Sequence, residues 1–188
     1  MRHHIIKEKI ISKTKYVEHV VRTVDGFNRE VVKLPPGGQV LPYFKDTSGK
    51  WKIVLVSQYR ISLERKTIEG AGGGIDKDEY VPKALARELN EEAGIKVKSQ
   101  DITMVFSEYI LTSLLNATMF GGIVRINAHM VKNKNKRNSG NGERTQVEIF
   151  DLKDLLRKRE AGAIKIDLMT SRLIDEVAKA TGLLIRKY

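Results

Sequence analysis

A run of three glycines, Gly72–Gly74, precedes a stretch with helical spacing over residues 80–93. Leu85 and Leu89 lie four residues apart, which places them on one apolar face of a helix, and Gly94 is suited to end that helix. Glycine has no Cβ, so this backbone can turn tightly and approach a metal ion or a phosphate closely. The sequence therefore predicts a glycine-rich turn that leads directly into a helix.

Three carboxylates occupy the predicted helix at a spacing that brings them together. Glu88, Glu91 and Glu92 stand at positions i, i+3 and i+4, which share one face. Three like charges repel one another unless a cation lies among them, and Mg²⁺ and Mn²⁺ prefer carboxylate oxygens. A solvated acidic face is the ordinary alternative for such a cluster. Glu79 and Arg87 are placed to form a pair that fixes the preceding loop against the helix.

The distribution of charge supports a metal site in this segment. The formal net charge of +11 comes from 34 Lys and Arg against 23 Asp and Glu. Such a surplus favours polyanionic partners, namely nucleic acid, anionic lipid or phosphorylated small molecules. Residues 51–100 are nearly neutral, however, with nine basic and eight acidic side chains. A basic chain that gathers its acids in one segment suggests a metal site inside a phosphate-attracting surface.

The remaining segments predict mostly strands. Alternating or β-branched runs mark strands at 5–12, 16–24, 29–34, 39–44, 51–59, 102–110, 117–127 and 147–152. Helices are expected at 154–162 and 171–182, and a loop at 132–142. The length of 188 residues fits one domain with a short appendage, and the absence of cysteine excludes disulfides, zinc–thiolate sites and cysteine nucleophiles. This order of elements predicts a mixed sheet packed between helices.

The glycine–helix segment has the spacing of a known signature. Glu79 follows Gly73 after five residues, Arg87–Leu89 follow after seven more, and Glu91–Glu92 and Gly94–Ile95 each follow after one. This pattern resembles the signature of the Nudix hydrolase family at every fixed position. The resemblance implies that Gly73, Glu79 and Gly94 are structural residues of the signature. It also implies the α+β fold of that family, an α/β/α sandwich with a mixed sheet between helices.

Flanking residues resemble the ADP-ribose and nucleotide-sugar pyrophosphatase branch of that family. Gln58–Arg60 and Glu69–Asp76 are similar to two motifs of the branch. The resemblance implies a hydrolase domain over residues 46–188 and a β-rich extension over residues 1–45. In this branch the N-terminal strands often exchange between subunits, so the extension is expected to be a dimerisation element and the protein a homodimer.

The activity implied by the resemblance is Mg²⁺-dependent, or Mn²⁺-dependent, hydrolysis of a nucleoside diphosphate sugar such as ADP-ribose. The products would be a nucleoside monophosphate and a sugar phosphate. Carried over residue by residue, the implied metal ligands are the Gly72 carbonyl, Glu88, Glu92 and Glu143. The implied catalytic group consists of Arg87, Glu91, Glu92 and Glu143, in which Arg87 maintains the loop–helix geometry.

Two residues outside the signature are candidates for binding the substrate. The guanidinium of Arg60 matches phosphate oxygens in a bidentate manner, which makes it a candidate phosphate clamp. Glu69 is a candidate hydrogen-bond acceptor for the substrate, and a salt bridge within the turn is an equal alternative. Glu143 is preferred over Glu148 as the late acid because it stands at the mouth of a predicted strand.

Departures from the branch leave other activities open. Ala71 replaces the usual turn proline, and residues 109–113 contain no proline. Other nucleotide sugars, including GDP-mannose and UDP-glucose, are therefore compatible substrates. A Nudix enzyme acting on RNA 5′ ends or dinucleoside polyphosphates is an alternative, as is a non-catalytic module that senses a nucleotide sugar. Nucleic acid is thus a partner that the charge allows but the motifs do not favour.

A basic loop follows the predicted strand at residues 117–127. Three interpretations are open for the loop's basic residues: a solvated hairpin, a phosphate-gathering lid near Glu143, or a weak nucleic-acid patch. The residues are Lys132, Lys134, Lys136 and Arg137. Apolar runs fall short of the roughly 18–20 residues of a membrane helix, and the N-terminus lacks the pattern of a signal peptide. A cytoplasmic location without membrane association is therefore expected.

Overall fold

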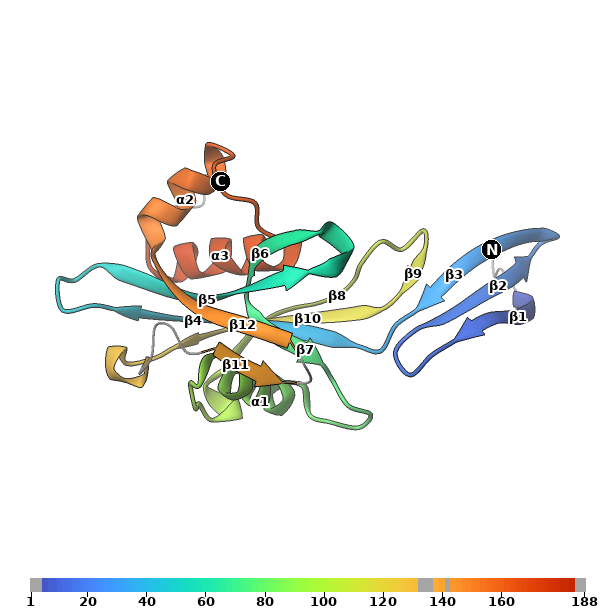
Figure 1. The fold of residues 1–188 in the computed structure, drawn as a ribbon, viewed down its shortest axis with the longest axis horizontal. Helices are drawn as coiled ribbons and strands as arrows, with labels where there is room; N and C mark the ends of the chain where they lie inside the picture. The colour runs from blue at the N-terminus through green and yellow to red at the C-terminus, as the bar shows by residue number, and fades with distance from the viewer. Residues whose placement is uncertain (1–4, 132–136, 141–142, 185–188) are drawn as a thin grey trace.

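The computed structural model describes residues 5–131, 137–140 and 143–184, which form two β-sheets and three α-helices. Figure 1 shows the elements in order along the chain. The strands are β1 (Ile5–Lys13), β2 (Glu18–Val24), β3 (Phe27–Lys33), β4 (Gly37–Lys45), β5 (Trp51–Arg60), β6 (Arg65–Glu69), β7 (Ala71–Gly74), β8 (Thr103–Tyr109), β9 (Leu115–Asn116), β10 (Thr118–Arg125), β11 (Arg137–Gly140) and β12 (Glu143–Asp151). The helices are α1 (Val81–Ala93), α2 (Leu152–Glu160) and α3 (Leu168–Ala180).

The larger sheet has eight strands and a mixed direction. Its main path runs β11-β12-β5-β4-β10-β8, with β6 paired to β5 and β7 paired to β4. The β4–β10 pair is parallel, with Tyr43 opposite Arg125, and the other pairs are antiparallel. Central strands such as β5 are almost continuously apolar because both of their faces are covered.

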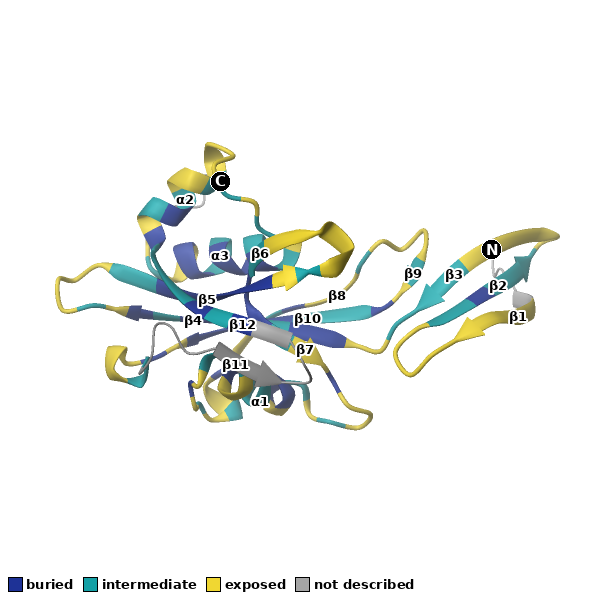
Figure 2. Cartoon of the chain, viewed as in Figure 1, coloured by how far each residue is buried: buried dark blue, intermediate teal, exposed yellow. Residues whose placement is uncertain are grey.

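Helices cover both faces of this sheet, so the predicted α/β/α sandwich is confirmed (Figure 1). Neighbouring residues on β4 point to opposite faces, as the pleat requires. Val40 packs in the core cluster that contains Leu85 and Leu89 of α1. Leu41 packs in the second cluster, with Leu173 of α3 and residues of α2. Figure 2 shows the buried residues concentrated where these three layers meet.

The smaller sheet extends away from the sandwich (Figure 1). It has the order β1-β2-β3-β9, in which β1, β2 and β3 form antiparallel pairs and β9 joins β3 in parallel. Among the residues of this sheet whose burial the structure describes, Val20 alone is buried. Residues 37–45, which the sequence grouped with the N-terminal extension, form β4 in the middle of the larger sheet. The smaller sheet therefore contains the strands before Gly37 together with β9.

Two other expectations need correction. The glycines at 72–74 were expected to form a tight turn, but they belong to strand β7, which pairs with β4. The expected loop at 132–142 contains strand β11, which pairs with β12, while residues 132–136 and 141–142 lie outside the described residues. No helix among the described residues is long and apolar enough to cross a membrane.

Candidate active site

Helix α1 presents the acidic residues beside strand β7. Its apolar face is fixed because Leu85 and Leu89 are buried against the sheet. The helix ends at Gly94, which has φ of 67° and whose N–H donates to the carbonyls of Asn90 and Leu89. This left-handed conformation favours glycine, which explains the residue at that position of the signature.

The glycines of β7 allow a very close approach between backbone segments. A Cβ at Gly72 would lie 2.1 Å from the Gly38 carbonyl oxygen on β4. A Cβ at Gly73 would lie 2.6 Å from Oε1 of Glu88. Neither glycine has a positive φ, so each is needed for space and not for an unusual backbone conformation. The carboxylate of Glu88 can therefore lie directly against the β7 backbone.

Glu92 joins the helix to the same strand. Its Oε2 accepts a hydrogen bond of 2.8 Å from the Gly72 backbone N–H. Glu88 and Glu92 are four residues apart on one face of α1, and both are partly buried. The structure thus brings two of the predicted metal ligands, Glu88 and Glu92, to neighbouring glycines of one strand.

Arg87 is the centre of the ion-pair network next to these carboxylates. Its Nη2 lies 3.2 Å from Oε2 of Glu79, and its Nη1 lies 2.7 Å from Oε1 of Glu88. Nη1 also lies 3.4 Å from Oε2 of Glu91, and Nη2 donates to the Gly74 carbonyl oxygen at 3.1 Å. The guanidinium therefore ties the loop, the end of β7 and α1 together.

The pKa values of two carboxyls in this network, Glu79 and Glu88, are shifted in opposite directions. Hydrogen bonds from Arg87 lower the pKa of Glu79, although burial opposes the change. Burial raises the pKa of Glu88, and the neighbouring carboxylates of Glu91 and Glu79 add to the rise, while Arg87 partly offsets it. A cation placed near Glu88 would favour its ionised form.

These residues fit a hard divalent cation by their donor chemistry. Glu88 and Glu92 supply carboxylate oxygens, and the adjacent glycine strand leaves no side chain between them and the backbone. Among the residues that the structure describes, no group of three or more His, Asp or Glu is close enough to enclose a metal ion. Glu143 begins β12 with its backbone opposite Gly140, and its side chain lies outside the described part.

Arg60 and Glu69 bind each other across β5 and β6. Arg60 Nη2 lies 2.5 Å from Oε2 of Glu69, and its Nε donates to Oε1 at 2.9 Å. Thr67 donates to Glu69 at 2.5 Å, and Gln58 donates at 3.4 Å. The salt bridge that was one of the two expectations for Glu69 is therefore present. Burial raises the pKa of this carboxyl, but the hydrogen bonds from Arg60 and Thr67 outweigh it and hold the pKa below its ordinary value.

Sequence reasoning missed a buried hydroxyl that supports the start of β7. Thr170 of α3 is fully buried; its Oγ1 accepts a 2.8 Å hydrogen bond from the Gly70 N–H and donates one of the same length to Oε1 of Gln39. Gln39 and Thr170 are 131 positions apart in the chain. No local pattern signals such a contact, because it depends on how α3 packs against β4.

The sandwich fold, the glycine strand and the acidic helix face define the class of protein. The NUDIX domain model matches residues 38–169, which is more than two thirds of the chain. The chain therefore belongs to the Nudix family, and the expected family membership is confirmed.

One curated relative is similar over part of its length. It is an ADP-ribose pyrophosphatase of Bacillus subtilis (strain 168), which is 35% identical over 99 residues. The aligned residues are 50% of this chain and 51% of the relative. The chain thus matches about half the length of that protein.

Proposed function

We propose that this protein hydrolyses the pyrophosphate bond of a nucleoside diphosphate sugar related to ADP-ribose. The observation that carries the proposal is the placement of Glu88 and Glu92 of α1 against Gly73 and Gly72 of β7. This gives two hard-oxygen donors beside a backbone that a diphosphate can approach. The printed activity of the Bacillus subtilis relative supports the choice of substrate class.

The proposed roles follow from the contacts of each side chain. Glu88, Glu92 and the Gly72 carbonyl would hold Mg²⁺ or Mn²⁺, which neutralises diphosphate charge and lowers the pKa of a bound water. Arg87 holds α1 against β7 through its contacts with Glu79 and the Gly74 carbonyl. Glu91 is the most exposed acid of the three on α1 and faces solvent, which suits a proton acceptor.

In the proposed reaction, one water molecule is consumed and one phosphorus–oxygen bond of the diphosphate is broken. A water oxygen forms a new bond to one phosphorus, and the bond from that phosphorus to the bridging oxygen breaks. The bridging oxygen leaves with the other phosphate, and one proton of the water passes to Glu91 or Glu143. The products are a nucleoside monophosphate and a sugar phosphate.

The substrate's phosphates are proposed to meet Arg60. Glu69, which accepts hydrogen bonds from Thr67 and Gln58, holds the guanidinium from one side, while the Arg60 side chain remains 37% exposed. A fixed, partly exposed guanidinium loses little entropy when it binds a phosphate. In this proposal Glu69 is a positioning residue for Arg60 and does not contact the substrate.

A substrate panel tests the activity. The full-length chain is incubated with Mg²⁺ or Mn²⁺ and ADP-ribose, GDP-mannose, UDP-glucose, a dinucleoside polyphosphate or a capped RNA, and products are identified by mass. We expect a nucleoside monophosphate and a sugar phosphate from at least one nucleotide sugar, with ¹⁸O from labelled water in one product. Turnover of only the capped RNA or the dinucleoside polyphosphate would contradict the substrate class. No turnover combined with ligand-induced thermal stabilisation would favour a sensing module.

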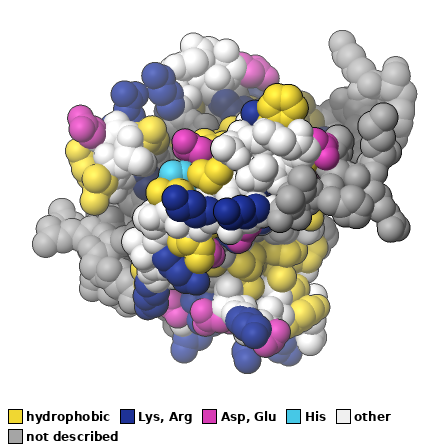
Figure 3. Space-filling model, turned by 90° about the vertical axis from the view of Figure 1, so that its right-hand side faces the viewer, with side chains coloured by type: hydrophobic (Ala, Val, Ile, Leu, Met, Phe, Trp, Pro, Cys, Tyr) yellow, Lys and Arg dark blue, Asp and Glu magenta, His cyan; other side chains and the backbone are white. Residues whose placement is uncertain are grey.

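We also infer that two chains associate through the N-terminal sheet. Apolar side chains there remain exposed, including Phe27 at 65%, Ile10 at 52% and Ile11 at 49%. Figure 3, which views this end of the molecule, shows hydrophobic side chains among Lys and Arg on the surface. A sheet with so little buried apolar area gains stability when a partner covers it.

Sedimentation at micromolar concentration checks this association. We expect the mass of a dimer, and a shift towards the 21.3 kDa chain when Ile10 and Phe27 are both replaced by Ser. A single 21.3 kDa species for the unmodified protein at every concentration would overturn the proposed dimer.

A further inference from the structure

Two cavities lie beside the end of the larger sheet at which Lys45 of β4 pairs with Trp51 of β5. One has a volume of about 670 Å³ and is lined by Trp51, Leu183, Lys50 and Lys153 among others. The second has a volume of about 620 Å³ and is lined by residues that include Lys96, Lys98, Arg125 and Met130. Each volume is within the range of small-molecule sites, so each hollow has room for a group the size of a nucleoside.

Trp51 and Arg125 connect the two cavities. The Arg125 guanidinium lies 5.3 Å from the centre of the Trp51 ring, and Lys45 Nζ lies 5.6 Å from it. Trp51 lines the first cavity and Arg125 lines the second. The indole therefore holds two cations in place at the boundary between the hollows.

The surface around the cavities carries surplus positive charge. The cavity linings together contain seven Lys and Arg against three Asp. Asp151 and Asp154 are already paired, with Lys52 at 3.3 Å and Arg157 at 2.7 Å. Six exposed basic residues form no salt bridge with any carboxylate of the described chain: Lys45, Lys50, Lys96, Lys98, Arg125 and Lys153.

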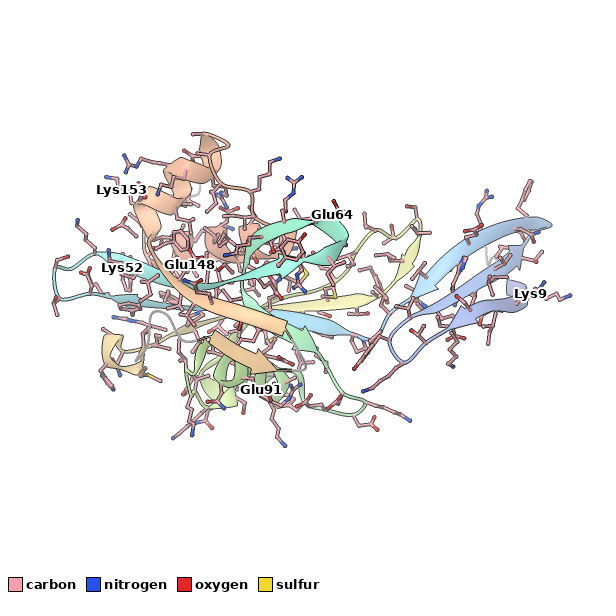
Figure 4. All side chains as sticks on the ribbon, in the orientation of Figure 1. Lys9, Lys52, Glu64, Glu91, Glu148 and Lys153 are labelled. Atoms are coloured by element: carbon pink, nitrogen blue, oxygen red, sulfur yellow. The ribbon has the colours of Figure 1, made fainter. Side chains whose placement is uncertain are left out.

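The first cavity lies at the far end of β4 from the proposed hydrolytic site, whereas the second cavity is closer, because Lys96 follows Glu92 by four residues. Gly38 of β4 pairs with Gly73 beside the α1 carboxylates, and Lys45 at the other end of the strand pairs with Trp51. Seven residues of strand span about 23 Å. Figure 4 shows Lys52 and Lys153 at the end of the molecule opposite to Lys9.

We propose that this cationic end, defined by the two cavities and the six residues named above, binds single-stranded nucleic acid. Unpaired cations at intervals match the repeated phosphates of a strand, and their release of counterions drives such binding. Hollows lined partly by apolar side chains, such as Leu183 in one and Met130 in the other, match unstacked bases, which a duplex does not expose. A membrane surface would require protruding apolar side chains, and the apolar groups here line recesses.

The test measures binding of labelled 12-nucleotide RNA and DNA single strands to the full-length chain, with a duplex of the same length and anionic vesicles for comparison. Lys98 and Lys153 are replaced together by Glu. The matched control replaces Lys9 and Lys165 by Glu, which changes the net charge equally at exposed sites. Lys9 lies at the opposite end of the molecule (Figure 4), and Lys165 precedes Ile166, which bridges to Ile68 of β6.

We expect the Lys98→Glu/Lys153→Glu variant to lose about tenfold or more in affinity for the single strand at low salt, with the salt slope shallower by about 1.4. The control variant is expected to lose less than about threefold, and hydrolysis of nucleotide sugars is expected to be unchanged in both. The RNA and DNA arms show which sugar the surface prefers. The proposal is overturned if both variants lose affinity equally, if duplex or vesicles bind as tightly as the single strand, or if no strand binds at low salt. None of these results depends on the hydrolytic activity.

Discussion

Oε2 of Glu92 accepts a hydrogen bond of 2.8 Å from the backbone N–H of Gly72, and this contact joins the acidic face of α1 to β7. The geometry of the proposed metal site therefore depends on the strand as much as on the helix. Changes in the β7 glycines should affect activity through the carboxylates that they contact.

Gly73→Ala tests this dependence. The added Cβ would lie 2.6 Å from Oε1 of Glu88, which is the far end of a flexible side chain and can move. We expect activity to fall by about 10–100-fold because a carboxylate displaced by about 1 Å loses its position, while stability changes by less than about 1 kcal/mol. Gly74→Ala is the control, because its Cβ would meet nothing within 4 Å. Equal activity in the two variants would mean that the position of Glu88 is unimportant.

Arg87→Ala should reduce both stability and activity. The change removes contacts to Glu79, Glu88 and the Gly74 carbonyl, and it leaves the partly buried Glu88 without its cation. Because the guanidinium is about one third exposed, we expect a modest loss of about 1–3 kcal/mol in urea denaturation. Arg157→Ala removes a more exposed ion pair and should cost less than about 1 kcal/mol. Similar losses in both variants would contradict the central role of Arg87.

The Arg60–Glu69 pair predicts a pH dependence of stability. The pKa of Glu69 is lowered in the folded protein from its ordinary value of 4.5, so the folded state binds this proton less readily than the unfolded state. The stabilisation is therefore present above pH 4.5 and is lost as the pH falls through the lower folded pKa. Glu69→Gln should flatten the decrease of unfolding free energy below that pH. An unchanged slope in the variant would show that the pair contributes nothing to the acid sensitivity.

Thr170→Val tests the support of the β6–β7 connection by α3. The variant keeps the shape of the side chain but leaves the Gly70 N–H without its partner, which should cost about 1–3 kcal/mol. Thr170→Ser retains the hydroxyl and should cost less. If Val and Ser are equally destabilising, packing and not the hydrogen bond explains the role of the residue.

Local signals in the sequence are sufficient to predict helix α1 and the membership of the Nudix family. Leu85, Leu89 and Gly94 define the apolar face and the end of the helix, and the acids are placed by the same periodicity. The layer arrangement also follows from the order of strands and helices. These features depend on residues within one element, so periodicity reveals them.

Features that depend on pairing between elements could not be predicted in the same way. Glycine is intrinsically unfavourable in strands, and the pairing of β7 with β4 outweighs this tendency. Arg60 and Glu69 each suited a role in binding substrate. They are not directly opposite in the β5–β6 pairing, and only the folded structure shows that their side chains bond to each other. The contact between Thr170 and Gln39 requires the whole fold.

The central claim is that Glu92 acts through its charge in metal-dependent hydrolysis of a nucleotide sugar. Glu92→Gln keeps an oxygen that can accept from Gly72 but removes the charge. The most direct measurement is the Mg²⁺-dependent rate of this variant on the best nucleotide sugar, beside Glu160→Gln as an exposed control. We predict a loss of at least about 100-fold for Glu92→Gln, a normal rate for the control and an unchanged melting temperature for both. Full activity of Glu92→Gln would contradict the claim.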